Sequence, residues 1–406
     1  MAVVQSILLV LFWVSVLLGL YTYLGYPLLL AALARLRRQP RFDENQLPDL
    51  TMIIAAFNEE AVIAGKIEHA LSLDYPAEKY RVLVAADGST DRTAEIVRSF
   101  ADPRVVLSFS PERRGKLAAT ANAMARIPGG IVVITDANNR YSHDALRRLV
   151  APFSDPHVGG VSGAKHIVRD ASALGASEGL YWKYESFIKA QESRLSSCVA
   201  MPGEILAMRR ELFVPPRGSV ILDDVHHAMQ ILDQGYRIVY EPRAKSFEPI
   251  SITARDEFER RSRLTAGRYQ ALKLIPPSLF YRRPVVMWQW LSHKLTRLLL
   301  PFAMLGALVA NILLVIWPPV GGTWPAWVTL AFPYGLGMLG LQGGFYFLAW
   351  IGGRTARRGR LGKVLYVPSF LVASNFAALA GLYRHLTRRQ TPMWRRVARP
   401  GEEPAA

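Results

Sequence analysis

Three long stretches of the chain contain no Asp, Glu, Lys or Arg. They cover residues 1–34, 298–353 and 364–383. A helix needs about 20 apolar residues to cross the hydrocarbon core of a bilayer. We therefore predict a transmembrane anchor over 1–34, two transmembrane helices over 298–353, and a further membrane helix over 364–383 that either spans the bilayer or re-enters it.

Between the first two stretches, short β-branched runs alternate with amphipathic segments. Runs with the composition of buried strands occur at 50–56, 81–86, 105–107 and 131–134, and a helix-like segment follows each of them. Strand–helix alternation predicts an α/β fold in which helices cover both faces of a mostly parallel sheet. We assign this domain to residues 42–270, with transmembrane α-helices before and after it in the sequence.

Two further segments combine cations with apolar surface. Residues 271–297 contain Trp288, Trp290 and Lys294, a mixture that is typical of amphipathic helices in the headgroup plane of a membrane. A helix on the surface of the α/β domain has the same pattern. The chain ends in a basic tail over residues 384–406.

The net charge indicates the side of the membrane on which the α/β domain lies. The 406 residues include 49 Lys and Arg against 32 Asp and Glu, a formal net charge of +17, although 51% of the residues are hydrophobic. This composition excludes intrinsic disorder, and the single cysteine excludes an intramolecular disulfide. The cations cluster beside the apolar stretches, as at Arg37 and Arg38, so they favour membrane lipid over a nucleic-acid partner. They predict a multi-pass protein of the inner cell membrane with its α/β domain in the cytoplasm. If residues 364–383 do not cross the membrane completely, the basic tail also lies in the cytoplasm. We favour this arrangement.

Polar side chains follow three of the four predicted strands at their carboxyl ends. The three runs are Phe57-Asn58-Glu59-Glu60, Asp87-Gly88-Ser89-Thr90-Asp91 and Thr135-Asp136-Ala137-Asn138-Asn139. Each run alone is better explained by a helix cap or a turn. Because parallel sheets bind ligands at the carboxyl edge, the three runs together predict a binding site there.

These runs, together with Gly115-Lys116, resemble the nucleotide-sugar domain of family-2 glycosyltransferases. The resemblance in motifs covers about residues 50–265 and implies a GT-A (Rossmann-like) fold. The order of the apolar stretches resembles the synthase branch of that family, which includes hyaluronan, cellulose, chitin and poly-N-acetylglucosamine synthases. The resemblance therefore implies a nucleotide-diphosphate sugar as donor, with a UDP-sugar favoured, and Mg²⁺ or Mn²⁺ as cofactor.

The resemblance assigns donor binding to eight positions, which are Ala55, Phe57, Glu59, Asp87, Lys116, Asp136, Arg260 and Arg263. It places Phe57 against the base, Glu59 and Asp87 on the base and ribose, and Lys116 on the diphosphate. Asp136 and Asn138 stand at the two acidic positions of the family's metal motif. Asn138 offers a carbonyl oxygen without a charge, so metal binding there depends more on Asp136.

Two segments resemble the acceptor half of the family's site. Gly203 and Glu204 lie in a segment that implies contact with the acceptor, although Glu204 is an unusual residue there. Asp223 and Asp224 precede a predicted helix, where adjacent acids are also common as caps. In the family the second acid of this pair is the catalytic base. The resemblance therefore implies that Asp224 takes the proton of the acceptor hydroxyl, with inversion at the anomeric carbon and with Asp223 as the second candidate.

Residues 258–264 stand in the place of the family's Gln-x-x-Arg-Trp motif, with Arg263 at its arginine. Arg260 stands where the family has Gln, and Leu264 stands where it has Trp. The family's Trp ring resembles a platform for the acceptor sugar, and residues 267–270 are a candidate partial replacement for it. The resemblance implies an inverting, metal-dependent membrane glycosyltransferase that extends a polysaccharide. The alternative is the transfer of a single sugar to a lipid-linked acceptor, which the missing Trp favours.

Overall fold

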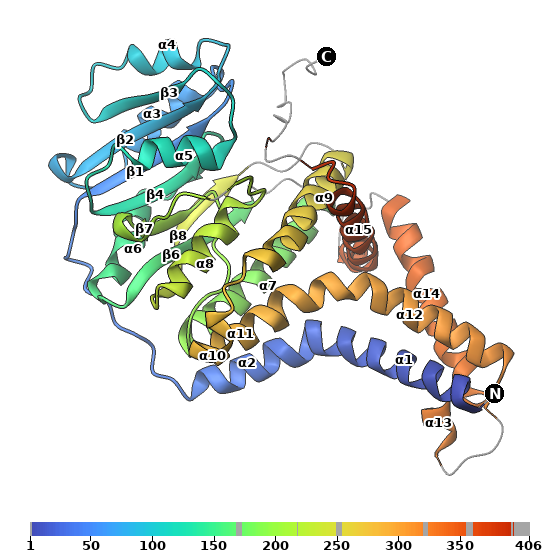
Figure 1. Ribbon diagram of the computed structural model, residues 1–406. Helices are drawn as coiled ribbons and strands as arrows, with labels where there is room; N and C mark the ends of the chain where they lie inside the picture. Colours follow the sequence, from blue (N-terminus) through green and yellow to red (C-terminus); the bar gives the residue numbers. More distant parts are fainter. Residues whose placement is uncertain are drawn as a thin grey trace.

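The computed structural model describes residues 2–167, 173–216, 218–248, 254–319, 324–354, 360–390 and 393. It contains an α/β domain and a set of long helices that extends from it, as the ribbon in Figure 1 shows. Most of the predicted basic tail, from 394 to 406, lies outside the described residues.

An eight-stranded sheet forms the centre of the α/β domain, in the order β3-β2-β1-β4-β7-β6-β8-β5. The strands are β1 (Leu50–Ala56), β2 (Tyr80–Asp87), β3 (Val105–Ser110), β4 (Ile131–Asp136), β5 (Arg140–Tyr141), β6 (Val158–Ile167), β7 (Leu206–Arg209) and β8 (Arg237–Glu248). β1 pairs in parallel with β2 and β4, and β2 pairs in parallel with β3. The four predicted strands therefore end at one edge, where the polar runs begin.

The complete sheet is mixed rather than mostly parallel. β7 pairs antiparallel with β4 and β6, and β5 pairs antiparallel with β8, whereas β6 and β8 are parallel. The sequence pattern missed the last four strands because β6 contains glycines and β8 contains charged residues. Packing requires at least one of these glycines, since a Cβ on Gly159 would lie 2.5 Å from Leu212 Cδ1.

Helices cover both faces of the sheet. They are α3 (Ile63–Leu71), α4 (Thr93–Arg98), α5 (Lys116–Met124), α6 (Ala145–Val150), α7 (Ala173–Leu195) and α8 (Asp223–Asp233). Successive residues of β1 point to opposite faces. Ile54 therefore joins a core with residues of α3 and α6, whereas Ile53 joins a second core with residues of α5 and α8.

The remaining helices include two long apolar ones. They are α1 (Ala2–Leu20), α2 (Tyr26–Arg35), α9 (Ala254–Ala271), α10 (Ser278–Arg282), α11 (Pro284–Trp290), α12 (Thr296–Ile316), α13 (Ala326–Thr329), α14 (Tyr334–Arg354) and α15 (Arg360–Leu386). Among the described residues, only Val3–Arg35 and Pro284–Ile316 are long and apolar enough to cross a membrane. Each is continuous through a π-helical turn, at Tyr21–Gly25 and Leu291–Leu295. The second apolar helix therefore begins inside the segment predicted to be interfacial.

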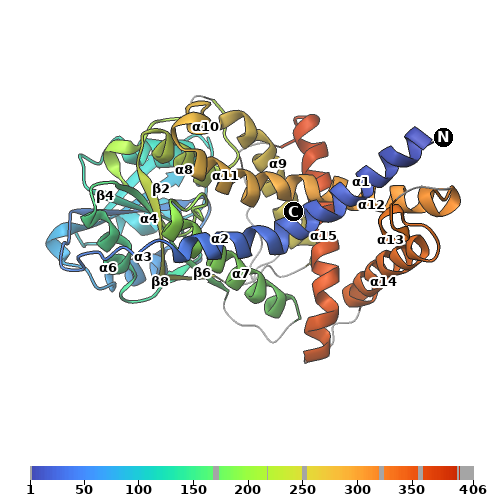
Figure 2. The ribbon, with the colours of Figure 1, turned by 90° about the horizontal axis from the view of Figure 1, so that it is seen from below.

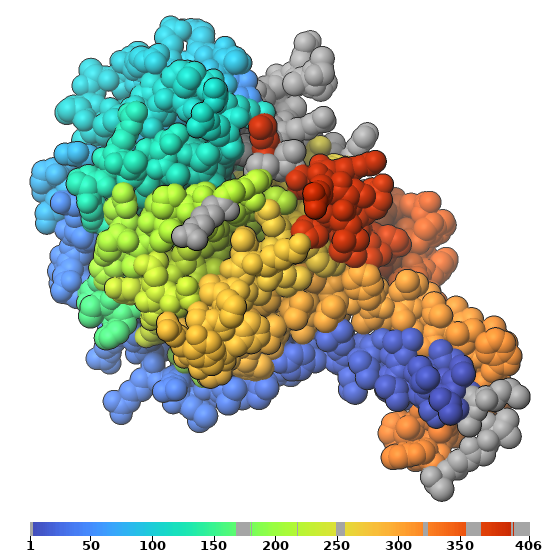
Figure 3. Space-filling view, viewed as in Figure 1, coloured from blue at the N-terminus to red at the C-terminus, as the bar shows by residue number. Residues whose placement is uncertain are grey.

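The last helix, α15, runs across the direction of α1 and α12. Figure 1 shows α15 nearly end-on while α1 and α12 lie lengthwise in the plane of the picture, and Figure 2 shows α15 lengthwise. α15 packs along α9, where Arg384 pairs with Glu259 at 2.5 Å. A Cβ on Gly381 would lie 2.7 Å from the carbonyl oxygen of Ser262, so the two helix backbones are in close contact. In the space-filling view of Figure 3, α15 (red) lies against the yellow and orange helices that border the α/β domain.

Candidate functional site

The loops after β1 and β2 are joined by hydrogen bonds at the carboxyl edge of the sheet. The backbone N–H of Asn58 donates to Ser89 Oγ at 3.1 Å, and Asn58 Oδ1 accepts from the N–H of Thr90 at 2.8 Å. The N–H of Glu59 donates to Thr93 Oγ1 at 2.8 Å. Asn58 adopts a left-handed conformation, with φ of 52°. The loop after β2 therefore holds the loop after β1, which carries Phe57 and Glu59, in place.

Asp87 is 1% exposed, and both of its carboxylate oxygens accept backbone hydrogen bonds. The N–H of Arg114 donates to Oδ1 at 2.9 Å, and the N–H of Gly115 donates to Oδ2 at 2.7 Å. Gly88, with φ of 65°, allows this approach, because a Cβ there would lie 2.6 Å from the nitrogen of Arg113. The carboxylate that was predicted to bind base and ribose thus fixes the loop before α5 and, with it, the position of Lys116.

The side chain of Phe57 is covered on one face by a residue that the sequence analysis did not select. The guanidinium of Arg113 lies 3.6 Å from the centroid of the Phe57 ring. The signal available in the sequence was the position of Arg113 two residues before Gly115, in the loop that leads to Lys116. Ala55, also predicted to contact the donor, is buried in β1 and pairs in register with Asp136.

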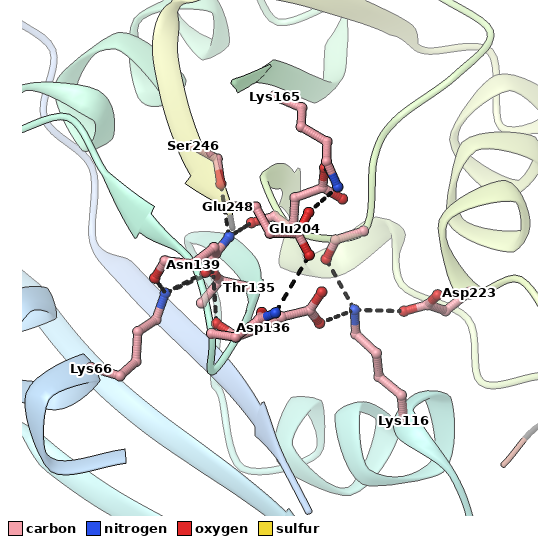
Figure 4. Close-up of polar contacts among 12 residues, drawn as sticks. Lys66, Lys116, Thr135, Asp136, Asn139, Lys165, Glu204, Asp223, Ser246 and Glu248 are labelled. Atoms are coloured by element: carbon pink, nitrogen blue, oxygen red, sulfur yellow. Dashed lines mark hydrogen bonds and ion pairs between the residues drawn. The ribbon is translucent and has the colours of Figure 1, made fainter. Parts of the chain in front are cut away.

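One ammonium group joins the donor half and the acceptor half of the predicted site, as Figure 4 shows. Lys116 Nζ lies 2.6 Å from Asp136 Oδ1, 3.0 Å from the carbonyl oxygen of Gly203 and 3.4 Å from Asp223 Oδ2. Gly203 makes room for this arrangement, because a Cβ there would lie 3.2 Å from Nζ. Four residues predicted from four separate segments are therefore in direct contact.

The charges of these groups depend on one another. Burial lowers the pKa of Lys116, but the carboxylates of Asp136 and Asp223 outweigh it and hold that pKa well above its ordinary value. Burial raises the pKa of Asp136 in spite of Lys116. Burial also acts to raise the pKa of Asp223, but Lys116 and His227 lower it below its usual range. Lys116 is therefore a permanent cation, and Asp223 is its ionised partner.

Asp224 differs from Asp223 although the two residues are adjacent at the start of α8. Burial and the charge of Asp223 raise the pKa of Asp224 to about 6. Asp224 Oδ1 accepts a hydrogen bond from the N–H of Val225 at 2.8 Å. One turn further along, His227 is completely buried, and its ring nitrogens have no hydrogen-bond partner among the residues that the structure describes. Burial lowers the pKa of His227 to about 4. At neutral pH the pair thus combines an ionised Asp223 with an Asp224 whose pKa suits proton transfer.

The two arginines predicted to bind the diphosphate have different surroundings in α9. Arg260 donates from Nε and Nη2 to the carboxylate of Glu257, each at 2.9 Å. Arg263 is half-buried and makes no hydrogen bond or ion pair with any residue that the structure describes. Burial lowers the pKa of Arg263, while the nearby carboxylates, with Asp223 the strongest, act in the opposite direction. The guanidinium of Arg263 is therefore near the acidic site and available to a ligand, whereas that of Arg260 is engaged by Glu257.

Asp136 and Asn138 offer the oxygen donors that Mg²⁺ and Mn²⁺ prefer. The amide nitrogen of Asn138 donates to Glu248 Oε1 at 3.4 Å. Within the described part of the chain, no three His, Cys, Asp or Glu side chains are grouped closely enough to hold a metal ion. The donor set therefore fits a cation that takes most of its remaining ligands from a bound diphosphate, and it does not fit a cation held by the protein alone.

A buried network that the sequence analysis missed supports the end of β4. Lys66 is 4% exposed and donates to Asn139 Oδ1 at 2.6 Å, to the Asn139 carbonyl oxygen at 2.8 Å and to Thr135 Oγ1 at 3.2 Å. Burial lowers the pKa of Lys66 to about 7. Asn139 Nδ2 in turn donates to the carbonyl oxygen of Glu204 at 2.7 Å. The network thus links the strand that carries Asp136 to the segment of Gly203 and Glu204.

Comparison with known sequences assigns a family to part of the chain. Residues 51–214 match the model of glycosyl transferase family 2. A probable glycosyltransferase, YdaM of Bacillus subtilis (strain 168), is 24% identical over 305 residues, which are 69% of each chain. The poly-β-1,6-N-acetyl-D-glucosamine synthase of Staphylococcus aureus (strain COL) is 25% identical over 245 residues. That match covers 58% of this chain and 58% of the synthase, which is less than two thirds of its length.

Comparison with solved structures agrees with this assignment at the level of the fold. The mannosyltransferase PcManGT from Pyrobaculum calidifontis, solved in complex with GDP-Man and Mn²⁺, superposes with a TM-score of 0.66 and 24% sequence identity. The superposition covers 94% of this chain and all of that one. The mixed sheet with its flanking helices therefore resembles a GT-A glycosyltransferase. Residues 51–214 form a glycosyl transferase family 2 domain, and the chain that carries it is a glycosyltransferase.

Proposed function

We propose that this chain transfers a sugar from a nucleotide-diphosphate sugar to an acceptor hydroxyl, with inversion at the anomeric carbon and with Asp224 as base. The observation that carries the proposal is the position of Lys116. Its ammonium contacts the predicted metal residue Asp136, the acceptor segment at Gly203 and the acid pair at Asp223. A site of this kind has to bring together a diphosphate, an anomeric carbon and a base, and Lys116 lies where they would meet.

The donor is proposed to lie along the carboxyl edge of β1, β2 and β4. The stacked Phe57 and Arg113 side chains offer a flat surface for the base, and Glu59 lies in the same loop. Lys116 and Arg263 supply positive charge for the diphosphate, and the fork of Arg263 suits a bidentate contact with phosphate oxygens. A UDP-sugar is the donor that we favour. GDP-mannose is an alternative, because the neighbouring mannosyltransferase was solved with it.

The metal is proposed to bind together with the donor. A Mg²⁺ or Mn²⁺ ion held by Asp136 and the carbonyl oxygen of Asn138 would neutralise charge on the departing diphosphate. Lys116 compensates the charge of Asp136 when no donor is bound, because its ammonium lies 2.6 Å from the carboxylate.

The acceptor is proposed to approach past Gly203 and Glu204 to the acid pair. Asp224 takes the proton of the acceptor hydroxyl while that oxygen forms a bond to the anomeric carbon. The bond from this carbon to the diphosphate breaks, and its electron pair leaves with the nucleoside diphosphate. Asp223 remains ionised beside Lys116 at 3.4 Å, so its charge keeps the pKa of Asp224 near neutrality.

The acceptor class and the location are also proposals. The named synthases favour a growing polysaccharide, and the two apolar helices favour a membrane location with the α/β domain at its cytoplasmic face. Because α15 crosses those helices and packs on α9, we propose that 364–383 lies at the membrane surface and that the basic tail stays on the cytoplasmic side.

The domain boundaries proposed from the sequence remain 1–34, 42–270, 271–297, 298–353, 364–383 and 384–406. Leu264 stands where the family has Trp, which favours the second candidate, addition of one sugar to a lipid-linked acceptor.

A donor panel tests the function. Purified full-length protein with Mn²⁺ is incubated with radiolabelled UDP- and GDP-sugars and membrane lipid, and the products are sized. Long polymer supports extension of a polysaccharide, and a single lipid-soluble product supports addition of one sugar to a lipid-linked acceptor. Absence of nucleotide release with every donor would contradict both functions.

Replacement of the proposed base should separate catalysis from binding. Asp224→Asn should lower transfer by a factor of about 100 or more while UDP affinity changes less than about threefold, because general-base catalysis contributes about 10² to 10⁴. The variant should melt at the wild-type temperature or above it at pH 7.5, because burial and Asp223 disfavour the charged form of Asp224. Asp233→Asn, at the exposed end of the same helix, is the matched control. Retained turnover in Asp224→Asn would refute the assignment.

The pH dependence of transfer follows from the same carboxylate. Asp224 acts as a base only when it is ionised, and its pKa is about 6. The transfer rate should therefore fall about tenfold for each pH unit below 6 and level off above pH 7. Stopped assays from pH 4.5 to 8.5, with circular dichroism at each pH to monitor folding, measure this profile. A rate that stays constant down to pH 5 would contradict the role of Asp224.

Gln270 of α9 is expected to position the acid pair. Its Oε1 accepts from the N–H of Ile221 at 2.8 Å, and its Nε2 donates to the carbonyl oxygen of Ser219 at 2.7 Å, just before Asp223. Gln270→Ala should lower kcat about 10- to 100-fold, because a displacement of about 1 Å is enough for such a loss. It should leave UDP affinity unchanged.

The matched control is Gln234, which also donates to backbone carbonyl oxygens, at the other end of α8. Gln234→Ala should keep kcat within about twofold of the wild type. Equal losses in the two variants would indicate a general effect on α8 and not the positioning of the acid pair by Gln270.

A further inference from the structure

Four side chains from four segments meet beside the proposed catalytic centre. They are Lys165 of β6, Trp182 of α7, Glu204 before β7 and Glu248 at the end of β8. Lys165 Nζ lies 3.2 Å from Glu204 Oε1, contacts Glu248 Oε2, and lies 5.2 Å from the centroid of the Trp182 ring. Figure 4 shows Lys165, Glu204 and Glu248 converging next to Asp136. We call these four residues the Trp182 cluster.

The Trp182 cluster is tied to the catalytic centre at two points. Glu204 directly follows Gly203, whose carbonyl oxygen accepts from Lys116 at 3.0 Å. Glu248 Oε1 accepts from Asn138 at 3.4 Å. The carbonyl oxygen of Glu204 also accepts from Asn139 at 2.7 Å and from Tyr141 at 2.8 Å, so this peptide unit is firmly held. A molecule bound at the Trp182 cluster would therefore lie next to the acid pair and the metal residue.

Glu204 has hydrogen-bonding capacity that the described residues leave unused. Its Oε1 is buried and lies 3.2 Å from the ammonium of Lys165, whereas no described residue donates a hydrogen bond to its Oε2. The side chain is 11% exposed. Carboxylate oxygens at such sites are normally hydrogen-bonded, and a hydroxyl group of a bound molecule would satisfy Oε2.

The charge of the Trp182 cluster selects the kind of molecule. The cluster itself has one ammonium and two carboxylates. Arg260 adds a positive charge near Lys165 and Glu248. However, its guanidinium is bound to Glu257, so carboxylates remain in excess and a diphosphate is not favoured there. A neutral molecule with several hydroxyl groups matches both the carboxylates and the ammonium.

The ring of Trp182 adds the apolar surface that a sugar requires. Ligand sites combine aromatic side chains with a few convergent polar groups, and the C–H face of a pyranose packs on an aromatic ring while its hydroxyls form hydrogen bonds. α9 offers no such ring at the family's usual position, because Leu264 stands there. Trp182 is half-buried and comes from α7 instead.

We propose that the Trp182 cluster binds the terminal sugar of the acceptor and that Trp182 is the platform on which this sugar packs. The inference rests on the proposed function, since it concerns the acceptor of that reaction. It adds a binding site on α7 and β6, which the sequence motifs do not include.

Oligosaccharide binding to the full-length protein tests the inference. Isothermal titration in detergent with Mn²⁺ and UDP uses three probes, which are tetrasaccharides of β-linked N-acetylglucosamine, of β-linked glucose and of mannose. We expect at least one to bind. Trp182→Ala should weaken that binding about tenfold or more, and Trp182→Phe should keep it within about threefold, because the aromatic face is retained. Glu204→Gln, which preserves the shape of the side chain, should weaken the same probe about fivefold or more.

Phe187→Ala is the matched control, because Phe187 is an aromatic residue of α7 that is 43% exposed. Its affinity for the probe should equal that of the wild type. The inference is overturned if no tetrasaccharide binds, if Trp182→Ala binds as tightly as the wild type, or if Phe187→Ala weakens binding equally. UDP and GDP are titrated into separate samples of the same protein with Mn²⁺ and without nucleotide. Failure of both to bind contradicts the proposed function itself, whereas nucleotide binding without tetrasaccharide binding contradicts only the Trp182 cluster.

Discussion

The ammonium of Lys116 is the interaction on which the site depends. It compensates Asp136 at 2.6 Å and Asp223 at 3.4 Å, and it holds the backbone at Gly203. Without it, the half-buried carboxylates of Asp136 and Asp223 would face each other without a counter-charge, which is unfavourable. The same cation joins the parallel strands β1 to β4, which carry donor motifs, to the segments before β7 and at the start of α8, which carry the acceptor motifs.

The surrounding fold serves to place this one group. Asp87 fixes the loop before α5 through two backbone N–H groups, and the network around Lys66 and Asn139 fixes the end of β4. On the opposite side, α9 holds the backbone before the acid pair through Gln270, and a Cβ on Gly267 would lie 2.5 Å from Leu222 Cγ. α15 packs on the other face of α9. α15, from near the end of the chain, thus supports through α9 a catalytic centre whose residues come earlier in the sequence.

The sequence predicted the parts of the fold whose signals are local. β1 to β4 were found because they are apolar runs, each followed by a helical segment, and Asp136 and Lys116 were found because their motifs adjoin those runs. β6 and β8 were missed because glycines and charged residues hide their alternation, and their partners are distant in sequence. The commitment of Asp87 to backbone hydrogen bonds depends on three-dimensional contacts that no spacing indicates.

The same limit applies to the candidate site. The sequence offers both Arg260 and Arg263 for the diphosphate, but Glu257 engages Arg260 and not Arg263. Trp182 was not selected from the sequence, because nothing near it in the sequence marks Lys165 or Glu204 as neighbours. Pairs that are far apart in sequence decide which members of a motif are available to a ligand.

The affinity of Lys116→Gln for nucleotide tests the central claim most directly. If Lys116 is the cation shared by the donor diphosphate and both halves of the site, titration with UDP or GDP in the presence of Mn²⁺ should show a loss of about tenfold or more in the folded variant. Lys79→Gln, an exposed lysine that donates to the Leu47 carbonyl oxygen, should bind like the wild type. Unchanged nucleotide affinity in Lys116→Gln would contradict the role assigned to this ammonium.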